Sequence, residues 1–289
     1  MSTPTLIADF EAYSDWRSNI SRSIGTLQGW LDEQDLGDAQ ISMRTQHILD
    51  RLREDQLNVA FIAEFSRGKS ELINAIFFSD YGQRILPSSA GRTTMCPTEL
   101  LFDPQREPSI QLLPIETRAS DTTTAEYKRY PDEWKTILLD TASGEGMQQA
   151  FQEVGQTRKV SKEEAERLGL FQPDNEDDLL TVDAEGLVEI PCWRHAIINF
   201  PHPLLKQGLV ILDTPGLNAI GTEPELTLNM LPNAHAILFI LAADTGVTKS
   251  DIEVWRNHIG TQAGRARGRL VVLNKIDGLW DPLKSSAEI

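Results

Sequence analysis

The stretch "NVAFIAEFSRGKSELINAIFF", residues 58–78, decides the fold of this chain. It begins with an apolar run typical of a short buried strand, continues through a glycine-containing loop, and ends with the apolar spacing of a helix. A strand, a loop and a helix in this order form a phosphate-binding loop, because backbone N–H groups at a helix N-terminus bind anions. We therefore predict a strand over residues 57–63 and a helix from residue 69 to about residue 78.

The residue types of this loop assign roles to its members. Lys69 would reach the β- and γ-phosphates of a nucleotide, and Ser70 would bind Mg²⁺. Ala63 stands where such loops often begin with glycine, and alanine is the smallest replacement at that tight turn. The predicted nucleotide-binding residues of the loop are Glu64, Phe65, Ser66, Arg67, Gly68, Lys69 and Ser70.

Two further motifs each follow an apolar run. In "DTPG", residues 213–216, Asp213 would reach Mg²⁺ through a water molecule, and the Gly216 N–H would meet the γ-phosphate. In "NKID", the predicted nucleotide-binding residues are Asn274, Lys275 and Asp277. A carboxylate at Asp277 would accept the N1 and N2 hydrogens of guanine, and adenine cannot supply them. The three motifs occur in the order that GTP binding needs.

The pattern of apolar runs predicts an α/β fold. Short strands are expected at residues 98–102, 109–115, 195–200, 208–213, 234–243 and 269–274. The last four are separated by helical spacers such as residues 250–259, an alternation that favours a mostly parallel sheet flanked by helices.

The N-terminal residues predict two helices between residues 5 and 55, with a break at "DLGD", residues 35–38. The apolar residues in the first recur at gaps of four and three, which makes a seam suited to another helix. Two alternatives remain: the helices pack on their own domain, or they belong to a bundle whose other members lie outside this sequence. We place the boundary between the helical segment, residues 1–56, and the α/β domain, residues 57–289, just before the first predicted strand.

The net charge of −16 argues against non-specific nucleic-acid binding. Residues 116–189 hold about 18 acidic and about 8 basic side chains. We predict an acidic insertion at about 116–190, made of loops that include "DNEDDL", without a strong core. The two cysteines, Cys96 and Cys192, are not spaced for a disulfide framework or a zinc site. The absence of a signal pattern and of a long apolar run favours a cytoplasmic protein.

The chain resembles the translation-factor class of GTPases and, within it, the bacterial dynamin-like proteins. The resemblance rests on "EFSRGKSELINAI", on the helical pair, and on "LPSSAGRTTMCPTEL", residues 86–100, whose residues 94–97 look like the T-x-x-P of the dynamin first switch. It covers roughly residues 57–115 and 195–280. It implies that Thr94, or Thr93 if the register shifts by one, meets Mg²⁺ and the attacking water.

Hydrolysis also needs a positioned water and a positive charge. Leu217 occupies the place where many small GTPases carry a water-orienting glutamine. Dynamins instead use a loop glutamine and a serine that helps to hold a monovalent cation. Here Phe65 replaces that glutamine, and Ser66 keeps the serine. Arg67 and Arg92 are alternative sources of positive charge, so the catalytic candidates are Ser66, Thr94 and Arg67, and the Mg²⁺ candidates are Ser70, Thr94 and Asp213.

The resemblance implies a GTPase with slow basal turnover that dimerises with nucleotide and drives membrane-associated remodelling. The alternatives are an Era-like regulatory or assembly GTPase and a nucleotide-binding scaffold with little hydrolysis. The expected partners are GTP and GDP, a second copy, and a membrane met through a region outside this sequence, but no nucleic acid. The expected location is the cytoplasm, peripheral at the inner membrane.

The sequence ends about a dozen residues after Asp277, where a complete GTPase domain adds one more strand and a helix. We therefore expect an N-terminal fragment of a longer protein that is prone to aggregate, with an uncovered sheet edge at residues 269–274.

Overall fold

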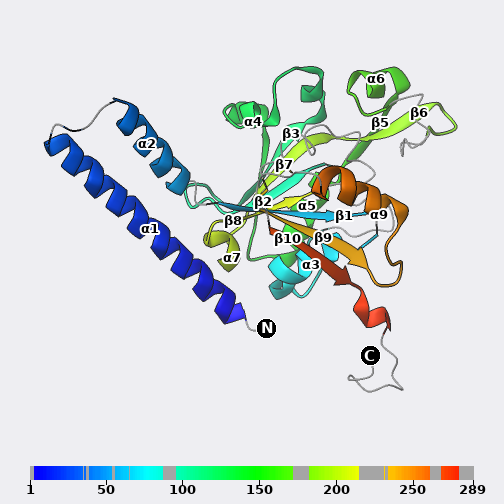
Figure 1. The fold of residues 1–289 in the computed structure, drawn as a ribbon. Helices are drawn as coiled ribbons and strands as arrows, with labels where there is room; N and C mark the ends of the chain where they lie inside the picture. The colour runs from blue at the N-terminus through cyan, green and yellow to red at the C-terminus, as the bar shows by residue number, and fades with distance from the viewer. Residues whose placement is uncertain are drawn as a thin grey trace.

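A single large sheet organises the chain in this computed structural model (Figure 1). The structure describes residues 3–34, 36, 39–53, 56–64, 66–86, 96–171, 182–214, 231, 234–260 and 268–279. Within these residues the sheet has eight strands in the order β10-β9-β1-β8-β2-β7-β3-β4. Their bounds are β1 (Leu57–Ala63), β2 (Thr98–Leu101), β3 (Ser109–Pro114), β4 (Lys135–Leu138), β7 (Trp193–Asn199), β8 (Leu209–Asp213), β9 (Ala236–Ala242) and β10 (Gly268–Asn274).

The sheet has a parallel half and a mixed half. Strands β10, β9, β1 and β8 are all parallel. Strand β2 is antiparallel to β8 and parallel to β7, whereas β3 is antiparallel to both β7 and β4. The predicted α/β fold with a mostly parallel sheet flanked by helices is therefore confirmed, and the strands expected at 57–63, 98–102 and 109–115 lie where the sequence placed them.

The side chains of β1 are buried on both faces of the sheet. Val59 and Phe61 join one core, and Ala60 and Ile62 join another on the opposite face, because successive strand side chains point to opposite sides. The first core receives side chains from α3 (Lys69–Phe77), α5 (Gly144–Val154) and α7 (Pro203–Lys206). The second receives them from α9 (Lys249–Val254) and the π-helical turn Trp255–Gly260 that continues it.

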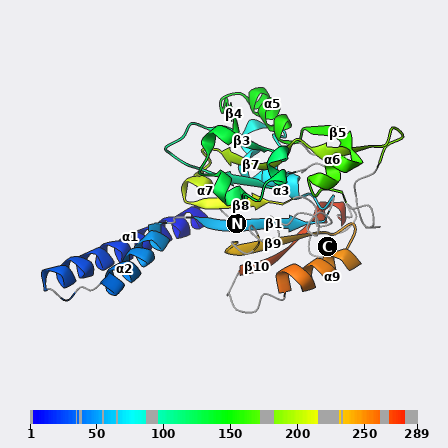
Figure 2. The same cartoon turned by 90° about the horizontal axis from the view of Figure 1, so that it is seen from above.

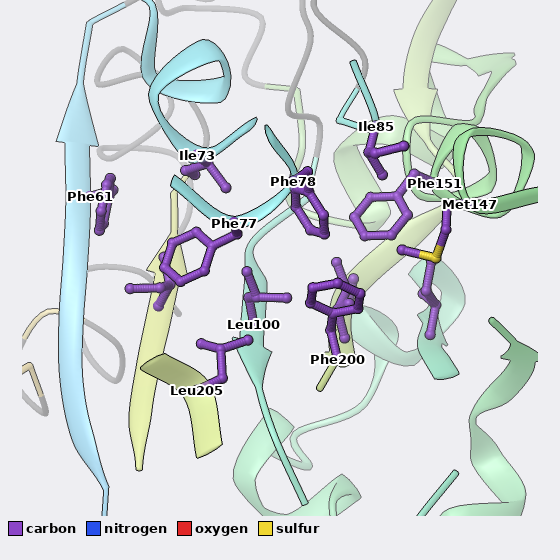
Figure 3. Close-up of a cluster of buried hydrophobic side chains, with 14 of the residues drawn as sticks. Phe61, Ile73, Phe77, Phe78, Ile85, Leu100, Met147, Phe151, Phe200 and Leu205 are labelled. Carbon is purple, nitrogen blue, oxygen red and sulfur yellow. The ribbon is translucent and has the colours of Figure 1, made fainter. Parts of the chain in front are cut away.

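The acidic region contributes to the main core, contrary to our expectation. Helix α5 buries Met147 and Phe151 completely, and Figure 3 shows both beside Phe78 and Phe200. The ring centroids of Phe78 and Phe151 lie 5.2 Å apart, and those of Phe78 and Phe200 lie 5.1 Å apart. The sequence did not predict this, because the four apolar residues of α5, Met147, Ala150, Phe151 and Val154, lie in an acidic region that we expected to be a solvated surface.

The same region also builds a small core of its own. Strands β5 (Thr157–Ser161) and β6 (Leu187–Pro191) pair in antiparallel fashion beside α6 (Lys162–Arg167). The expectation of loops without a strong core was therefore wrong, although "DNEDDL", residues 174–179, lies outside the described residues. The buried members of this core are Ile115, Val160, Ala165, Leu168, Leu170, Val188 and Ile190. The remaining short elements are α4 (Thr124–Tyr127) and the 3₁₀ turns Ser79–Tyr81, Ile115–Ala119, Pro131–Glu133 and Ile276–Leu279.

Two helices, α1 (Thr3–Glu33) and α2 (Ala39–Arg53), form a hairpin that projects from the sheet (Figure 1 and Figure 2). The predicted helical pair is confirmed. Each of Tyr13, Trp16, Leu27 and Trp30 is more than half exposed on α1, so its apolar face is not covered by the described residues. None of the described helices is long and apolar enough to cross a lipid bilayer.

Strand β10 forms one edge of the sheet, as expected for residues 269–274. Within the described part of the chain, Leu270, Val271 and Leu273 are 54–60% exposed. Because neighbouring residues of a strand face opposite ways, apolar side chains are exposed on both faces of β10.

Candidate nucleotide site

Parallel strands bring the three predicted motifs to one edge of the sheet. The phosphate loop follows β1, Asp213 ends β8, and Asn274 ends β10. Since β1, β8, β9 and β10 are parallel, their carboxyl ends lie along the same edge, where ligands of open α/β sheets bind.

Gly68 begins helix α3 in a conformation that suits glycine. Its φ is 84°, in the left-handed region, and a Cβ built there would lie 2.4 Å from Nδ2 of Asn274. Ser66, two residues earlier, also has a positive φ of 60°. Left-handed backbone on either side of Arg67 turns the loop sharply into the helix.

Lys69 joins the loop to the second motif. Its side chain is buried, and its ammonium ion pairs with Oδ1 of Asp213 and donates to the carbonyl of Thr214. The Thr214 hydroxyl donates to the carbonyl of Phe61 at 3.0 Å, which ties the end of β8 to β1. The loop lysine and the strand aspartate, 144 residues apart in sequence, are therefore in direct contact in the fold.

The surroundings of Asp213 fit a divalent cation. Its Oδ2 atom is buried and has no hydrogen-bond partner among the described residues. Ser70 lies half-buried in the first turn of α3, one residue from the lysine that meets this carboxylate. A carboxylate oxygen and a hydroxyl are the ligand types that Mg²⁺ prefers, with water in the remaining positions.

Arg67 points into a buried cluster of charges. Its Nη2 donates to Oε2 of Glu64 at 2.8 Å and to Oδ2 of Asp251, at the start of α9, at 3.0 Å. Its side chain is 2% exposed, and that of Asp251 is fully buried. The positive charge predicted for catalysis is thus held in ion pairs, and the catalytic role of Arg67 stays a prediction.

Glu64 completes this cluster. Burial raises the pKa of its carboxyl, but hydrogen bonds from Ser250, Thr248 and Arg67 outweigh burial, so the pKa lies below its ordinary value. Thr248 donates to Oε2 at 3.0 Å, and Ser250 donates to Oε1. Glu64 is therefore ionised at neutral pH and balances the charge of Arg67.

The third motif contacts the loop directly. The Asn274 Nδ2 donates to the carbonyl of Arg67 at 2.9 Å and approaches the carbonyl of Gly68 at 3.4 Å. Lys275 adopts a φ of 57°, and its ammonium lies 3.0 Å from Oδ2 of Asp244, just after β9. Asp277 is exposed in the following 3₁₀ turn and is open to a ligand.

Several predicted site residues lie outside the described residues. They are Phe65, Thr94 and Gly216, the alternatives Arg92 and Thr93, and Leu217, which stands where many small GTPases carry a water-orienting glutamine. Conversely, the sequence did not single out Thr248, Ser250 or Asp251. The only signal was "TKSD", residues 248–251, a pattern typical of a capping box at the start of a helix. This pattern does not indicate which residue the Asp251 carboxylate binds.

The chain matches the family model described as the dynamin family over residues 59–276, which is more than half of its length. A bacterial dynamin-like protein from Nostoc punctiforme is 22% identical over 296 residues, covering 99% of this chain and 35% of that protein. Dynamin-like protein A from Bacillus subtilis is 21% identical over 222 residues, covering 70% of this chain and 17% of that protein.

One short match has a higher sequence identity. The isoniazid-induced protein IniA from Mycobacterium tuberculosis is 40% identical over 60 residues, covering 20% of this chain and 9% of that protein. Among solved structures, an oligomerised bacterial dynamin pair aligns with a TM-score of 0.51 at 16% identity, covering 94% of this chain and 34% of the other. The similarity in structure concerns the fold, and the chain spans about a third of the length of the relative from Nostoc.

Proposed function

Because this chain belongs to the dynamin family, we propose that it binds GTP with Mg²⁺ and hydrolyses it to GDP and phosphate. One observation carries the proposal: the loop lysine, Lys69, meets Asp213 while Asn274 bonds the backbone of the same loop. Three motifs that are far apart in the sequence are thus in contact in the fold. Unrelated turns would not be expected to meet in this way.

Each motif would hold a different part of the nucleotide. The backbone N–H groups of residues 66–70 would surround the β-phosphate, and Lys69 would contact the β- and γ-phosphates. Asp277 would pair with the guanine edge, Lys275 would contact the nucleotide beside it, and Gly216 would meet the γ-phosphate. On entry of the phosphates the Lys69 ammonium would leave Asp213, because a triphosphate offers it a stronger partner.

Ser70, and Asp213 through water, are the groups that would hold Mg²⁺, with Thr94 joining them in the closed state. Bound Mg²⁺ would neutralise charge on the β- and γ-phosphates. The orphaned Oδ2 atom of Asp213 supports this assignment, since a buried carboxylate oxygen without a partner is costly.

Hydrolysis would be slow in the isolated chain. Phe65 and Leu217 cannot orient a water molecule, and Arg67 is held by two carboxylates, so its charge is not available to the phosphates in addition to that of Lys69. Ser66 would help to hold a monovalent cation that supplies this charge. Facing copies of the GTPase domain would order Thr94 and raise the rate.

We assign residues 1–56 to a neck or bundle segment and residues 57–289 to the GTPase domain. The solved bacterial dynamin pair is described as a mechanism for the long-range sensing and tethering of membranes. By analogy, nucleotide-dependent dimerisation of this protein would act in membrane-associated remodelling from the cytoplasmic side of the inner membrane, through residues outside this sequence. A scaffold that binds GTP with little hydrolysis is the second candidate, favoured by Phe65 and Leu217.

The test compares the wild-type chain with Lys69→Ala for binding of fluorescent GDP and for phosphate release from GTP. Lys69→Ala should weaken GDP binding at least about tenfold, since it removes the charge that faces the β-phosphate. Lys159→Ala is the matched control, because Lys159 forms an exposed ion pair with Asp183 far from the site. Unchanged affinity in Lys69→Ala would contradict the assignment of the loop, and GDP binding without phosphate release would favour the scaffold.

A further inference from the structure

We propose that Asp251 is a positioning residue for the phosphate loop and acts by holding the side chain of Arg67. We name the contact of Asp251 and Glu64 with Arg67 the Arg67 clamp. The clamp deepens the proposed GTP-binding function and rests on it. It assigns a role to helix α9, which carries none of the three nucleotide motifs.

The first argument is the burial of the ion pair. Arg67 is 2% exposed and Asp251 1% exposed, and their charged atoms lie 3.0 Å apart. A surface ion pair would mean little, but a buried one fixes its two residues, because breaking it leaves a charge without water or a partner. The clamp therefore fixes the middle of the loop to α9.

The second argument is that Arg67 is fixed from two sides. Its side chain is held by α9, and its carbonyl accepts a hydrogen bond from Asn274 at the end of β10. The residues on either side, Ser66 and Gly68, both have positive φ angles, 60° and 84°. This backbone suits Gly68, but at Ser66 it persists only when the surroundings hold it, so the two anchors on Arg67 are what keep the loop amides aimed at the ligand.

The third argument is that Asp251 is itself held rigidly. Its Oδ2 accepts from the backbone N–H of Thr248 at 2.9 Å, and the Thr248 hydroxyl oxygen accepts from the backbone N–H of Asp251 at 3.3 Å, which together form the capping box of α9. The Thr248 hydroxyl also lies 3.0 Å from Oε2 of Glu64. Thr248 and Asp251 thus begin helix α9 and also hold the clamp. A shift at the start of α9 would therefore move Arg67 and the loop.

The clamp predicts a selective loss of phosphate binding. Without it, the loop would sample other conformations and its N–H groups would no longer converge on the β-phosphate. The base motif at Asn274 and Asp277 would remain in place. Affinity for GDP should then fall much more than affinity for GMP, which has no β-phosphate.

The experiment measures binding of GDP and GMP to the full 289-residue chain and to Asp251→Leu, Arg67→Met and the double variant. Each single variant should weaken GDP binding at least tenfold and GMP binding less than threefold. The double variant should lose no more GDP affinity than Arg67→Met alone, because Asp251 acts only through Arg67. The double variant removes both charges of the buried pair, and Glu64 keeps its hydrogen bonds from Thr248 and Ser250, so this variant carries the comparison if a single variant fails to fold.

Glu126→Gln is the matched control, since Glu126 forms the capping box of α4 through hydrogen bonds from Thr123 within the same turn. It should leave both affinities unchanged. Equal losses of GDP and GMP affinity, additive losses in the double variant, or unchanged GDP binding in Asp251→Leu would each overturn the clamp. Failure of the wild-type chain to bind GDP would instead overturn the proposed function, and the two failures are thus distinct.

Discussion

At the residue scale, Gly68 is where two independent constraints meet. The left-handed backbone disfavours any side chain, and the position of a Cβ is occupied by the amide of Asn274. Asn274 could move aside, but it would then lose its hydrogen bond to the carbonyl of Arg67. The glycine of the loop thus serves the packing of the third motif as well as the turn.

Gly68→Ala should therefore destabilise the chain by about 1–3 kcal/mol and weaken GDP binding, because strain and the displaced Asn274 add. The control is Gly82→Ala, which has a similar φ of 62° but nothing within 4 Å of its Cβ. Urea unfolding and GDP titration of both variants measure the difference. If the two variants lose the same stability and both keep GDP affinity, the contact with Asn274 is not important.

At the element scale, one buried carboxylate joins three elements away from the nucleotide. Glu99 of β2 lies 3.0 Å from Nε2 of His195 on β7 and 2.7 Å from the ammonium of Lys128, which ends α4. Burial raises the pKa of Glu99, but the hydrogen bonds and charges of His195 and Lys128 lower it further, to about 2. This cluster fastens the mixed half of the sheet to α4.

The sign of the pH effect follows from this lowered pKa. The folded state keeps Glu99 ionised below the ordinary value of 4.5, so its stabilisation is complete above pH 4.5 and is lost as pH falls toward 2. Wild type should exceed Glu99→Gln in free energy of unfolding by up to about 3 kcal/mol at pH 6, and by progressively less below pH 4.5.

Urea unfolding at several pH values between 6 and 3 measures this difference. The exposed Glu133→Gln serves as the control and should change the free energy of unfolding only slightly at pH 6. A constant difference between wild type and Glu99→Gln over this range would mean that the ion cluster does not contribute as described.

Helix α1 supplies a second prediction at this scale. Tyr13 and Trp16 stack with their ring centroids 5.8 Å apart, and each of these, like Trp30, is more than half exposed. An apolar stripe of this kind favours association with other helices. The alternative in which the helices belong to a larger bundle is thus favoured over packing on their own domain.

Replacing Trp16 and Trp30 by serine should reduce self-association of the 289-residue chain and change GDP affinity less than about twofold, because the hairpin lies away from the site. Sedimentation velocity measures the association. Serine at Glu11 and Glu33, exposed polar positions on the same helix, is the control. An unchanged size distribution in the tryptophan variant would show that the stripe does not drive association.

At the scale of the whole molecule, the three predicted motifs follow parallel strands that end at one edge of the sheet. Strand β10 is an exposed edge next to the predicted base motif, and Asp277 and Ile276 are exposed beyond it. The residues that would position water are missing or lie outside the described chain. A second copy, through its own residues and by ordering the switch at Thr94, is the source of rate enhancement that we propose.

The rate of single-turnover GTP hydrolysis per molecule should therefore rise with protein concentration, by about tenfold or more between dilute and concentrated samples, if pairing completes the site. Quench-flow measurement of phosphate release at constant GTP occupancy tests this. Lys69→Ala provides the background rate. A rate per molecule that is independent of concentration would exclude activation by dimerisation.

The sequence alone determined the fold class and the position of the three motifs at the ends of strands. Each of these depends on local patterns: the apolar run, the glycine with its lysine and serine, and the polar residues at strand ends. Such patterns are short-range, so residues 57–78 and 269–277 could be interpreted without knowing their neighbours.

Only the tertiary structure decided what the charged residues do. Arg67 and Asp251 lie 184 residues apart, and no spacing rule relates them. The acidic region was misjudged for the same reason, since Met147 and Phe151 gain their core from strands and helices elsewhere in the chain. Long-range pairing and burial depend on the folded topology, because a side chain has no fixed partner until the sheet brings distant segments together.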